Sequence, residues 1–105
     1  MLLKVNTSNT DNSGIHAIAF QTMVSMQTVG LTRLDVIFQR GYSNMDSVFS
    51  FTINSNKADT VMRCLNDYVA KHVVSSRPLC TLFDNYSNFT CCPDITGVTV
   101  KTRKV

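Results

Sequence analysis

The segment Asn56 to Val73, NKADTVMRCLNDYVAKHV, has the most regular hydrophobic pattern in the chain. Its apolar residues recur at steps of three and four, which places them on one stripe of a helix with 3.6 residues per turn. The opposite face carries Asp59, Arg63, Asp67 and Lys71, whose charges alternate so that each can pair with the next turn. The segment is therefore predicted to be an amphipathic surface helix, which needs a sheet or a second helix to cover its apolar stripe.

Five short segments are predicted to be strands. Leu2 to Val5 and Leu79 to Phe83 are short apolar runs. Between residues 32 and 39 and between residues 48 and 53, apolar and polar side chains alternate, which is typical of half-buried strands. These two alternating segments are close enough in sequence to form a hairpin, and Ile95 to Val100 is β-branched enough to be an edge strand.

The segment Ile15 to Val29 fits two patterns. As a helix it places Ile15, Ile18 and Met26 on one face, whereas as a strand it places Ile18, Phe20 and Met26 on one side. Each pattern leaves some apolar residues on the wrong face. Fifteen residues is an ordinary length for a helix and a long one for a strand, so we expect a helix here.

With a helix at residues 15–29, the order of elements up to Phe83 is strand, helix, strand, strand, helix, strand. This is the order of a ferredoxin-like split β-α-β sandwich, in which two helices cover one face of a small antiparallel sheet. If residues 15–29 are strand instead, the expected fold is a β-meander with a single helix lying across it. Both alternatives are α+β. A chain of 105 residues suits one domain, which we expect to span residues 1–100.

The net charge of +3 comes entirely from the C-terminal end. Up to Asp94 the basic and acidic residues balance, and the excess is Lys101, Arg103 and Lys104. Residues 101–105 are therefore predicted to be an exposed basic tail. One alternative function is weak binding of nucleic acid through these three cations, although a protein that binds nucleic acid over its folded body usually carries a basic face there.

The chain contains four cysteines, Cys64, Cys80, Cys91 and Cys92. They lack the C-x-x-C spacing of a metal or redox motif, so we expect reduced thiols packed as small core residues, with no cofactor and no metal. The alternative is an oxidised, secreted chain, in which the sequons at Asn6, Asn85 and Asn88 would permit glycans. The first residues are too short and too soon polar for a signal peptide, and no apolar run approaches a membrane span. A cytoplasmic protein without membrane contact is the expectation.

Three functions are compatible with the sequence. In a one-sheet fold the face away from the helices would offer Ile37, Val48 and Leu82 among few charges, and such a face is often covered by another chain. The preferred hypothesis is a small soluble interaction or regulatory module that binds a protein partner or forms a homodimer. The nucleic-acid binder is the second hypothesis. The third is a small enzyme, for which the sequence places no nucleophile beside a base and so assigns no catalytic residue.

Overall fold

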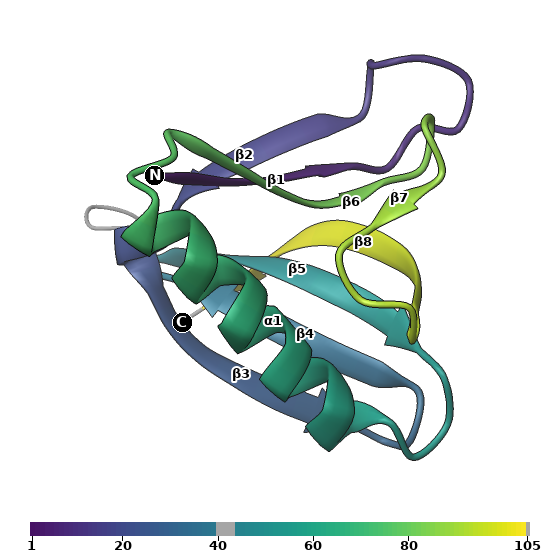
Figure 1. Ribbon diagram of the computed structural model, residues 1–105. Coiled ribbons are helices and arrows are strands. Elements are labelled where there is room, and N and C mark those ends of the chain that lie inside the picture. Colours follow the sequence, from purple (N-terminus) through teal and green to yellow (C-terminus); the bar gives the residue numbers. More distant parts are fainter. Residues whose placement is uncertain (40–43, 105) are drawn as a thin grey trace.

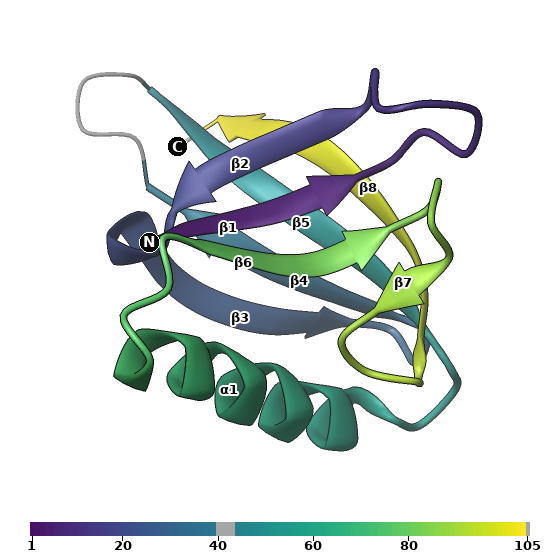
Figure 2. The same cartoon turned by 45° about the horizontal axis from the view of Figure 1, so that its top comes forward.

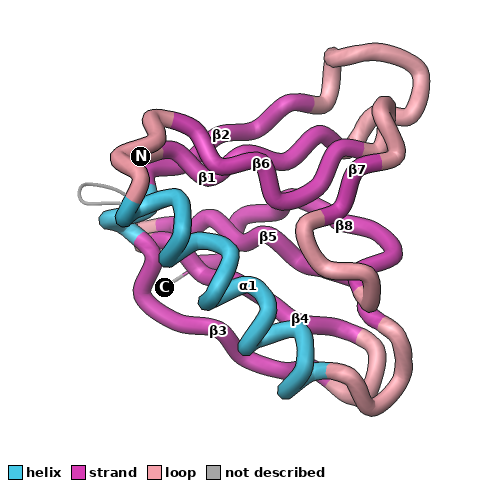
Figure 3. The backbone as a smooth tube through the Cα atoms, viewed as in Figure 1, coloured by secondary structure: helices cyan, strands magenta, loops and turns pink. Residues whose placement is uncertain are grey.

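The computed structural model describes residues 1–39 and 44–104, and within them it contains eight strands and one α-helix. In chain order the elements are β1 (Leu2–Asn6), β2 (Ile15–Ala19), the 3-10 helix η1 (Phe20–Thr22), β3 (Met23–Val29), β4 (Arg33–Phe38), β5 (Met45–Ile53), α1 (Ala58–Val74), β6 (Leu79–Asp84), β7 (Phe89–Thr90) and β8 (Ile95–Lys104). Figure 1 shows their arrangement and Figure 3 distinguishes helix, strand and loop along the same view. The fold is α+β, as predicted.

The strands form two four-stranded sheets. Sheet A has the order β2-β1-β6-β7, in which β1 runs parallel to β6 and the other neighbours are antiparallel. Sheet B has the order β3-β4-β5-β8 and is antiparallel throughout. The two views in Figure 1 and Figure 2 show the sheets as separate layers, with α1 lying beside β3.

The hydrophobic core lies between the two sheets and is closed on one side by α1. Leu3 and Val5 of β1 contribute to it from sheet A, and both are almost fully buried. Sheet B contributes three phenylalanine rings that meet edge to face, with the centroid of Phe49 4.9 Å from that of Phe38 and 6.4 Å from that of Phe51. This edge-to-face arrangement is one that aromatic rings prefer in cores.

The helix predicted over Asn56 to Val73 is confirmed by α1. Its buried residues are Val61, Leu65 and Val69. On the exposed face Arg63 Nη2 lies 3.1 Å from Asp59 Oδ2, one helical turn away, as the charge pattern predicts. Neither α1 nor any other helix in residues 1–39 and 44–104 is long and apolar enough to cross a membrane.

The predicted hairpin of residues 32–39 and 48–53 is also confirmed, because β4 and β5 pair in antiparallel register. A third strand, β3, extends this pair through a turn in which Gly30 has a φ of 65°. Glycine suits this position because a side chain would oppose the left-handed conformation.

The helix predicted over Ile15 to Val29 is wrong. β2 and β3 occupy the segment and η1 joins them, so the chain passes from an edge of sheet A to an edge of sheet B. Backbone hydrogen bonds hold the junction, from Phe20 N to Met1 O at 2.9 Å and from Gln39 N to Thr22 O at 2.8 Å. Pairing with β1 and β4 satisfies the backbone of this segment, and this tertiary context overrides the helical spacing of its side chains.

The order of elements is therefore not that of a ferredoxin-like sandwich. The runner-up, a β-meander with a single helix, describes β3, β4, β5 and α1 but not the second sheet. Two sheets arise because β2 pairs with β1, which in turn pairs with β6, whereas β3 pairs with β4 in the other sheet.

The C-terminal end is a strand rather than a tail. In the antiparallel register between β8 and β5, Arg103 lies opposite Asp46 and Lys104 lies opposite Met45. The boundary expected at residue 100 therefore falls inside β8, and Val105 lies outside the described residues.

Candidate functional site

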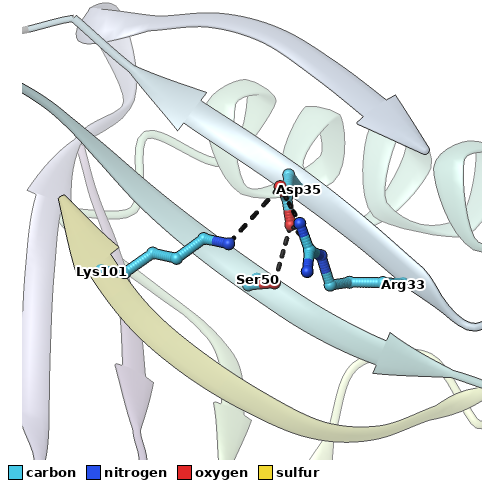
Figure 4. Close-up of polar contacts among 4 residues, drawn as sticks. All are labelled: Arg33, Asp35, Ser50 and Lys101. Carbon is cyan, nitrogen blue, oxygen red and sulfur yellow. Dashed lines mark hydrogen bonds and ion pairs between the residues drawn. The ribbon is translucent and has the colours of Figure 1, made fainter. Parts of the chain in front are cut away.

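A cluster of charged and polar side chains spans three strands on the face of sheet B that points away from α1 (Figure 4). Asp35 of β4 lies at its centre, with a side chain that is only 9% exposed. Ser50 Oγ of β5 donates a hydrogen bond of 2.7 Å to Asp35 Oδ1. Arg33 Nη2 donates to Asp35 Oδ2 over 3.3 Å, and Lys101 Nζ of β8 lies 3.9 Å from the same oxygen. Arg33 Nε is buried 3.2 Å from Asp35 Oδ1, within ion-pair range but not aligned for a hydrogen bond.

The alternation of β4 brings this cluster together. Leu34 and Val36 point into the core, so Arg33 and Asp35 point to the opposite face of sheet B. The register then sets Asp35 directly opposite Ser50 on β5. A short stretch of sequence thus carries core residues on one side and a charge network on the other.

The residues predicted to bind nucleic acid lie on or beside this polar face. Lys101 is the residue that reaches Asp35, and Arg103 Nη2 donates to Asp46 Oδ2 over 3.1 Å. Lys104 is exposed, and in the described part of the chain no ion pair involves it. Two of the three cations already face a carboxylate, which weakens the positive field that a phosphate backbone would meet.

The cluster around Asp35 is electrostatically satisfied and is not arranged for nucleophilic catalysis. The Ser50 hydroxyl directs its proton to a carboxylate that also neutralises Arg33 and Lys101. A serine nucleophile needs a positioned base, most often histidine, to take that proton. His72 lies on α1, where its Nδ1 is 2.9 Å from Tyr68 O.

The predicted protein-binding residues Ile37, Val48 and Leu82 do not share one exposed face. Ile37 and Val48 lie opposite each other in β4 and β5, whereas Leu82 belongs to β6 in sheet A and points into the core. Each of the three residues is only 1% exposed. The expectation assumed one sheet with an open side, but the chain forms two sheets, and the inner side of sheet A faces the core.

An exposed apolar face occurs instead on sheet A. In Figure 2 the side of β1, β2 and β6 that lies away from the core has no described element over it. We call this the outer face of sheet A, and it consists of Leu2, Lys4, Ile15, Ala17, Ala19, Leu79 and Thr81. Leu2, Ile15 and Leu79 are each 42–43% exposed. Lys4 is the one charged residue of this set, and the same register continues the face to Asn6 and Asp84, where Asn6 Nδ2 donates to Asp84 Oδ1 over 3.2 Å.

The strand pattern of residues 15–29 carries a signal for this face. Read as a strand, the run IHAIA puts Ile15, Ala17 and Ala19 on one side and His16 and Ile18 on the other. The choice of a helix for the segment hid that alternation. The parallel partner β6 lies far away in the sequence, so no local pattern indicates that Leu79 joins the same face.

The expectation of reduced thiols is wrong for Cys64 of α1 and Cys92, which form a disulfide with their Cα atoms 6.0 Å apart. Cys80 and Cys91 are free thiols. Burial raises the pKa of Cys80 to about 11 and that of Cys91 to about 12, so both are protonated at neutral pH.

Among the described residues no group of three or more histidine, cysteine or acidic side chains is arranged to hold a metal ion.

A small apolar groove of about 130 Å³ lies between β3 and α1. It is lined by Phe20, Met23, Met26, Leu65, Asn66, Val69 and Ala70. Because none of these side chains is a nucleophile, an acid or a base, the groove gives no support to the enzyme hypothesis.

Comparison of the chain with protein-family models, with curated proteins and with solved structures gave no match. Any inference about the function therefore starts from the surfaces and side-chain clusters of the chain itself.

Proposed function

We propose that this protein is a small interaction module that forms a homodimer through the outer face of sheet A. The observation that carries the proposal is an exposed, largely apolar sheet surface with Lys4 in its middle and Asp84 at its end. Contiguous apolar patches rimmed by polar residues are typical of protein-binding sites, and sheets commonly pack face to face about 10 Å apart. The proposed contact residues are thus Leu2, Ile15 and Leu79 in place of Ile37, Val48 and Leu82.

The outer face of sheet A is chemically suited to bind a second copy of itself. In a two-fold dimer a patch meets itself, so it must be nearly neutral and must offer both projections and hollows. Leu2 and Leu79 project side by side as register partners, while Ala17 and Ala19 leave space beside them on β2. Lys4 can lay its methylene stem along this surface and keep its ammonium group in water.

The size of the face predicts a weak dimer. Five-residue strands extend about 17 Å, and three neighbouring strands cover about 10 Å between their outer axes. Such a face is well below the roughly 800 Å² per partner of a standard stable interface. We therefore expect a dimer that dissociates on dilution rather than an obligate one.

The test is the molar mass in solution, measured by light scattering over a series of protein concentrations. Leu79→Glu puts a charge on the outer face of sheet A at a position already open to solvent, and it should give monomers throughout. Leu31→Glu is the matched control, because Leu31 is 61% exposed in the turn between β3 and β4 and should leave the dimer intact. A monomeric wild-type protein, or a Leu79→Glu variant as dimeric as the control, contradicts the proposal.

The variant Lys4→Leu distinguishes self-association of this face from binding of an acidic partner protein. Removing the Lys4 charge should strengthen apolar self-association, and high salt should leave that association unchanged. If the natural occupant carries acidic groups, the same substitution weakens binding and salt weakens it further. A Lys4→Leu protein that dimerises less than the wild type therefore excludes self-association as the role of this face.

The cytoplasmic location expected from the sequence stays a prediction. The Cys64–Cys92 disulfide counts against it, because disulfides persist mainly in oxidising compartments. The redox state of the compartment can be measured by labelling free thiols in protein taken directly from its source, with alkylation before lysis is complete. Four labelled cysteines support a reducing compartment, and two labelled cysteines support an oxidising one.

A further inference from the structure

Cys91 lies directly against the disulfide between Cys64 and Cys92. Its Sγ is 3.7 Å from Cys92 Sγ, which is van der Waals contact between two sulfur atoms. The Sγ of Cys64 lies 3.6 Å from the carbonyl oxygen of Cys91, so residue 91 touches both ends of the bridge. A backbone hydrogen bond of 3.0 Å from Cys91 N to Leu82 O holds this residue beside β6.

We propose that Cys64 has two disulfide partners, Cys92 and Cys91, and that the chain exchanges between them without an external oxidant. The structure then represents one of two linked forms of the segment that follows β7. In the form that the structure shows, Cys92 is buried in the core and bonded to Cys64. In the other form Cys91 is bonded to Cys64 of α1, and Cys92 is the free thiol.

The exchange is an intramolecular displacement at sulfur. Cys91 Sγ, which touches the Cys92 end of the bridge, first has to turn into line with the bond on the Cys64 side. The thiolate of Cys91 then attacks Cys64 Sγ, a Cys64–Cys91 bond forms, and the Cys64–Cys92 bond breaks with its electron pair on Cys92. Cys92 takes up the proton that Cys91 lost, so the numbers of thiols and disulfides do not change. Attack on Cys92 Sγ would instead close a disulfide between adjacent residues, which strains the backbone.

The surroundings of Cys91 make the exchange slow and dependent on pH. The titratable groups that interact with it are Cys80 on β6 and Tyr68 on α1, and each has its pKa raised mainly by burial. Both stay neutral between about pH 7 and pH 9. Since the pKa of Cys91 is about 12, its thiolate fraction and the exchange rate should rise about tenfold per pH unit in that range.

Differential alkylation of the oxidised wild-type protein tests the proposal. After incubation at each pH, thiols are blocked with a light reagent in acidic denaturant, bridges are reduced, and the released thiols receive a heavy reagent. No protease cleaves usefully between Cys91 and Cys92, so tandem mass spectrometry assigns the two labels. Cys80 should always carry the light label and serves as the internal standard.

The expected result is a light label on Cys92 in a fraction of molecules, with a matching heavy label on Cys91, appearing faster at higher pH. A light label confined to Cys91 and Cys80 at every pH overturns the proposal. Cys92→Ser offers an independent check, because Cys64 and Cys91 should then form the bridge under mild oxidation, while the Cys80→Ala, Cys92→Ser double variant should behave identically. If Cys64 and Cys91 both remain thiols in these folded variants, Cys64 has one partner and the proposal fails.

Discussion

Asp35 and Ser50 face each other across β4 and β5, and the 2.7 Å hydrogen bond from Ser50 Oγ to Asp35 Oδ1 lies on the face of sheet B opposite the core. Arg33 and Lys101 approach the same carboxylate from β4 and β8. Asp35 therefore connects three strands of sheet B through one nearly buried charge.

Asp35→Asn should destabilise the fold. It removes the charge that pairs with Arg33 and Lys101, and hydrogen bonds to charged groups contribute about 1.5–3 kcal/mol each when buried. Because both cations are about 40% exposed, we expect a loss of about 1–3 kcal/mol in the free energy of unfolding, measured by urea melts. Asp59→Asn, which removes the exposed pair with Arg63, should cost under about 0.5 kcal/mol. Equal losses from the two substitutions would show that the Asp35 network stabilises the fold no more than the exposed pair of Asp59 and Arg63.

Leu65→Ala should cost about 2–5 kcal/mol, because it removes a buried side chain of α1 and leaves a cavity in the core. Arg63→Ala, one turn away on the exposed face, should cost under about 1 kcal/mol. Denaturant melts of the two variants check the orientation of α1. A larger loss for Arg63→Ala than for Leu65→Ala is incompatible with the core described above.

Ile37→Asp should destabilise the monomer rather than merely dissociate a dimer. Ile37 is 1% exposed, so the substitution buries an unpaired carboxylate, a mechanism that costs several kcal/mol. Val24→Asp is the control at an exposed position on the neighbouring strand β3, where the loss should stay near or below about 1 kcal/mol. Circular dichroism melts distinguish the two outcomes. A fully folded, stable Ile37→Asp protein would mean that the face around Ile37 and Val48 is open after all.

Reduction of the Cys64–Cys92 disulfide should lower stability by about 3–4 kcal/mol, the loop-entropy value for a separation of 28 residues. Thermal melts with and without a reductant measure this change. Cys64→Ala, Cys92→Ala should melt as the reduced protein does and should no longer respond to reductant. An unchanged melting temperature in the wild type on reduction would contradict the bridge.

Asp84 should contribute to acid unfolding. Burial by itself raises the pKa of the Asp84 carboxyl, but hydrogen bonds from Ser87, Tyr86 and Asn6 outweigh this, so its pKa lies below the ordinary 3.8. A carboxyl with a lowered folded-state pKa stabilises the fold above its unfolded pKa, and this contribution disappears as pH falls through the folded-state pKa. We expect the urea midpoint to drop below about pH 4.

Asp84→Asn should lessen that drop, because the amide accepts similar hydrogen bonds but does not titrate. It should not abolish it, since hydrogen bonds from Ser13 and Ser8 lower the pKa of Asp11 in the same pH range. A pH profile of the variant that parallels the wild type between pH 7 and pH 3 would exclude a role for Asp84.

Local pattern was sufficient for the elements whose partners are close in sequence. The stripe that contains Val61, Leu65 and Val69 predicted α1, and the alternation around Val36 and Phe49 predicted the β4–β5 hairpin. In both cases the period of the side chains agrees with the burial that the fold imposes. These are the parts of the structure that the sequence could determine without knowledge of the topology.

The parts that were mispredicted depend on contacts between distant segments. Residues 15–29 have apolar side chains at both helical and strand spacing, and only the partners β1 and β4 decide between them. The same holds for Lys101 and Arg103, whose charge suggested a free basic end until the register with β5 set them near Asp35 and opposite Asp46. Because the outer face of sheet A combines three segments, it could not be recognised from any one of them.

The disulfide was missed for a related reason. Cys64 lies half-buried on α1, and Cys92 follows β7 in a stretch without clear periodicity. Spacing alone does not indicate how near the two Cα atoms lie, since that distance depends on how α1 crosses the β6–β7 hairpin.

The parallel pairing of β1 with β6 has a consequence for the order in which the chain can fold. β1 pairs with β6, which brings Leu2 opposite Leu79, and β5 pairs with β8. Both sheets therefore include a strand from the last third of the sequence. Closing such long loops costs entropy before it gives any contact, and folds rich in distant pairings form slowly. During synthesis the β3–β4–β5 meander and α1 can form early, but their apolar sides remain open to solvent until residues 79–104 have been made. The emerging chain therefore exposes unpaired strand edges for longer than a helical domain of this length, and it is prone to aggregate at that stage.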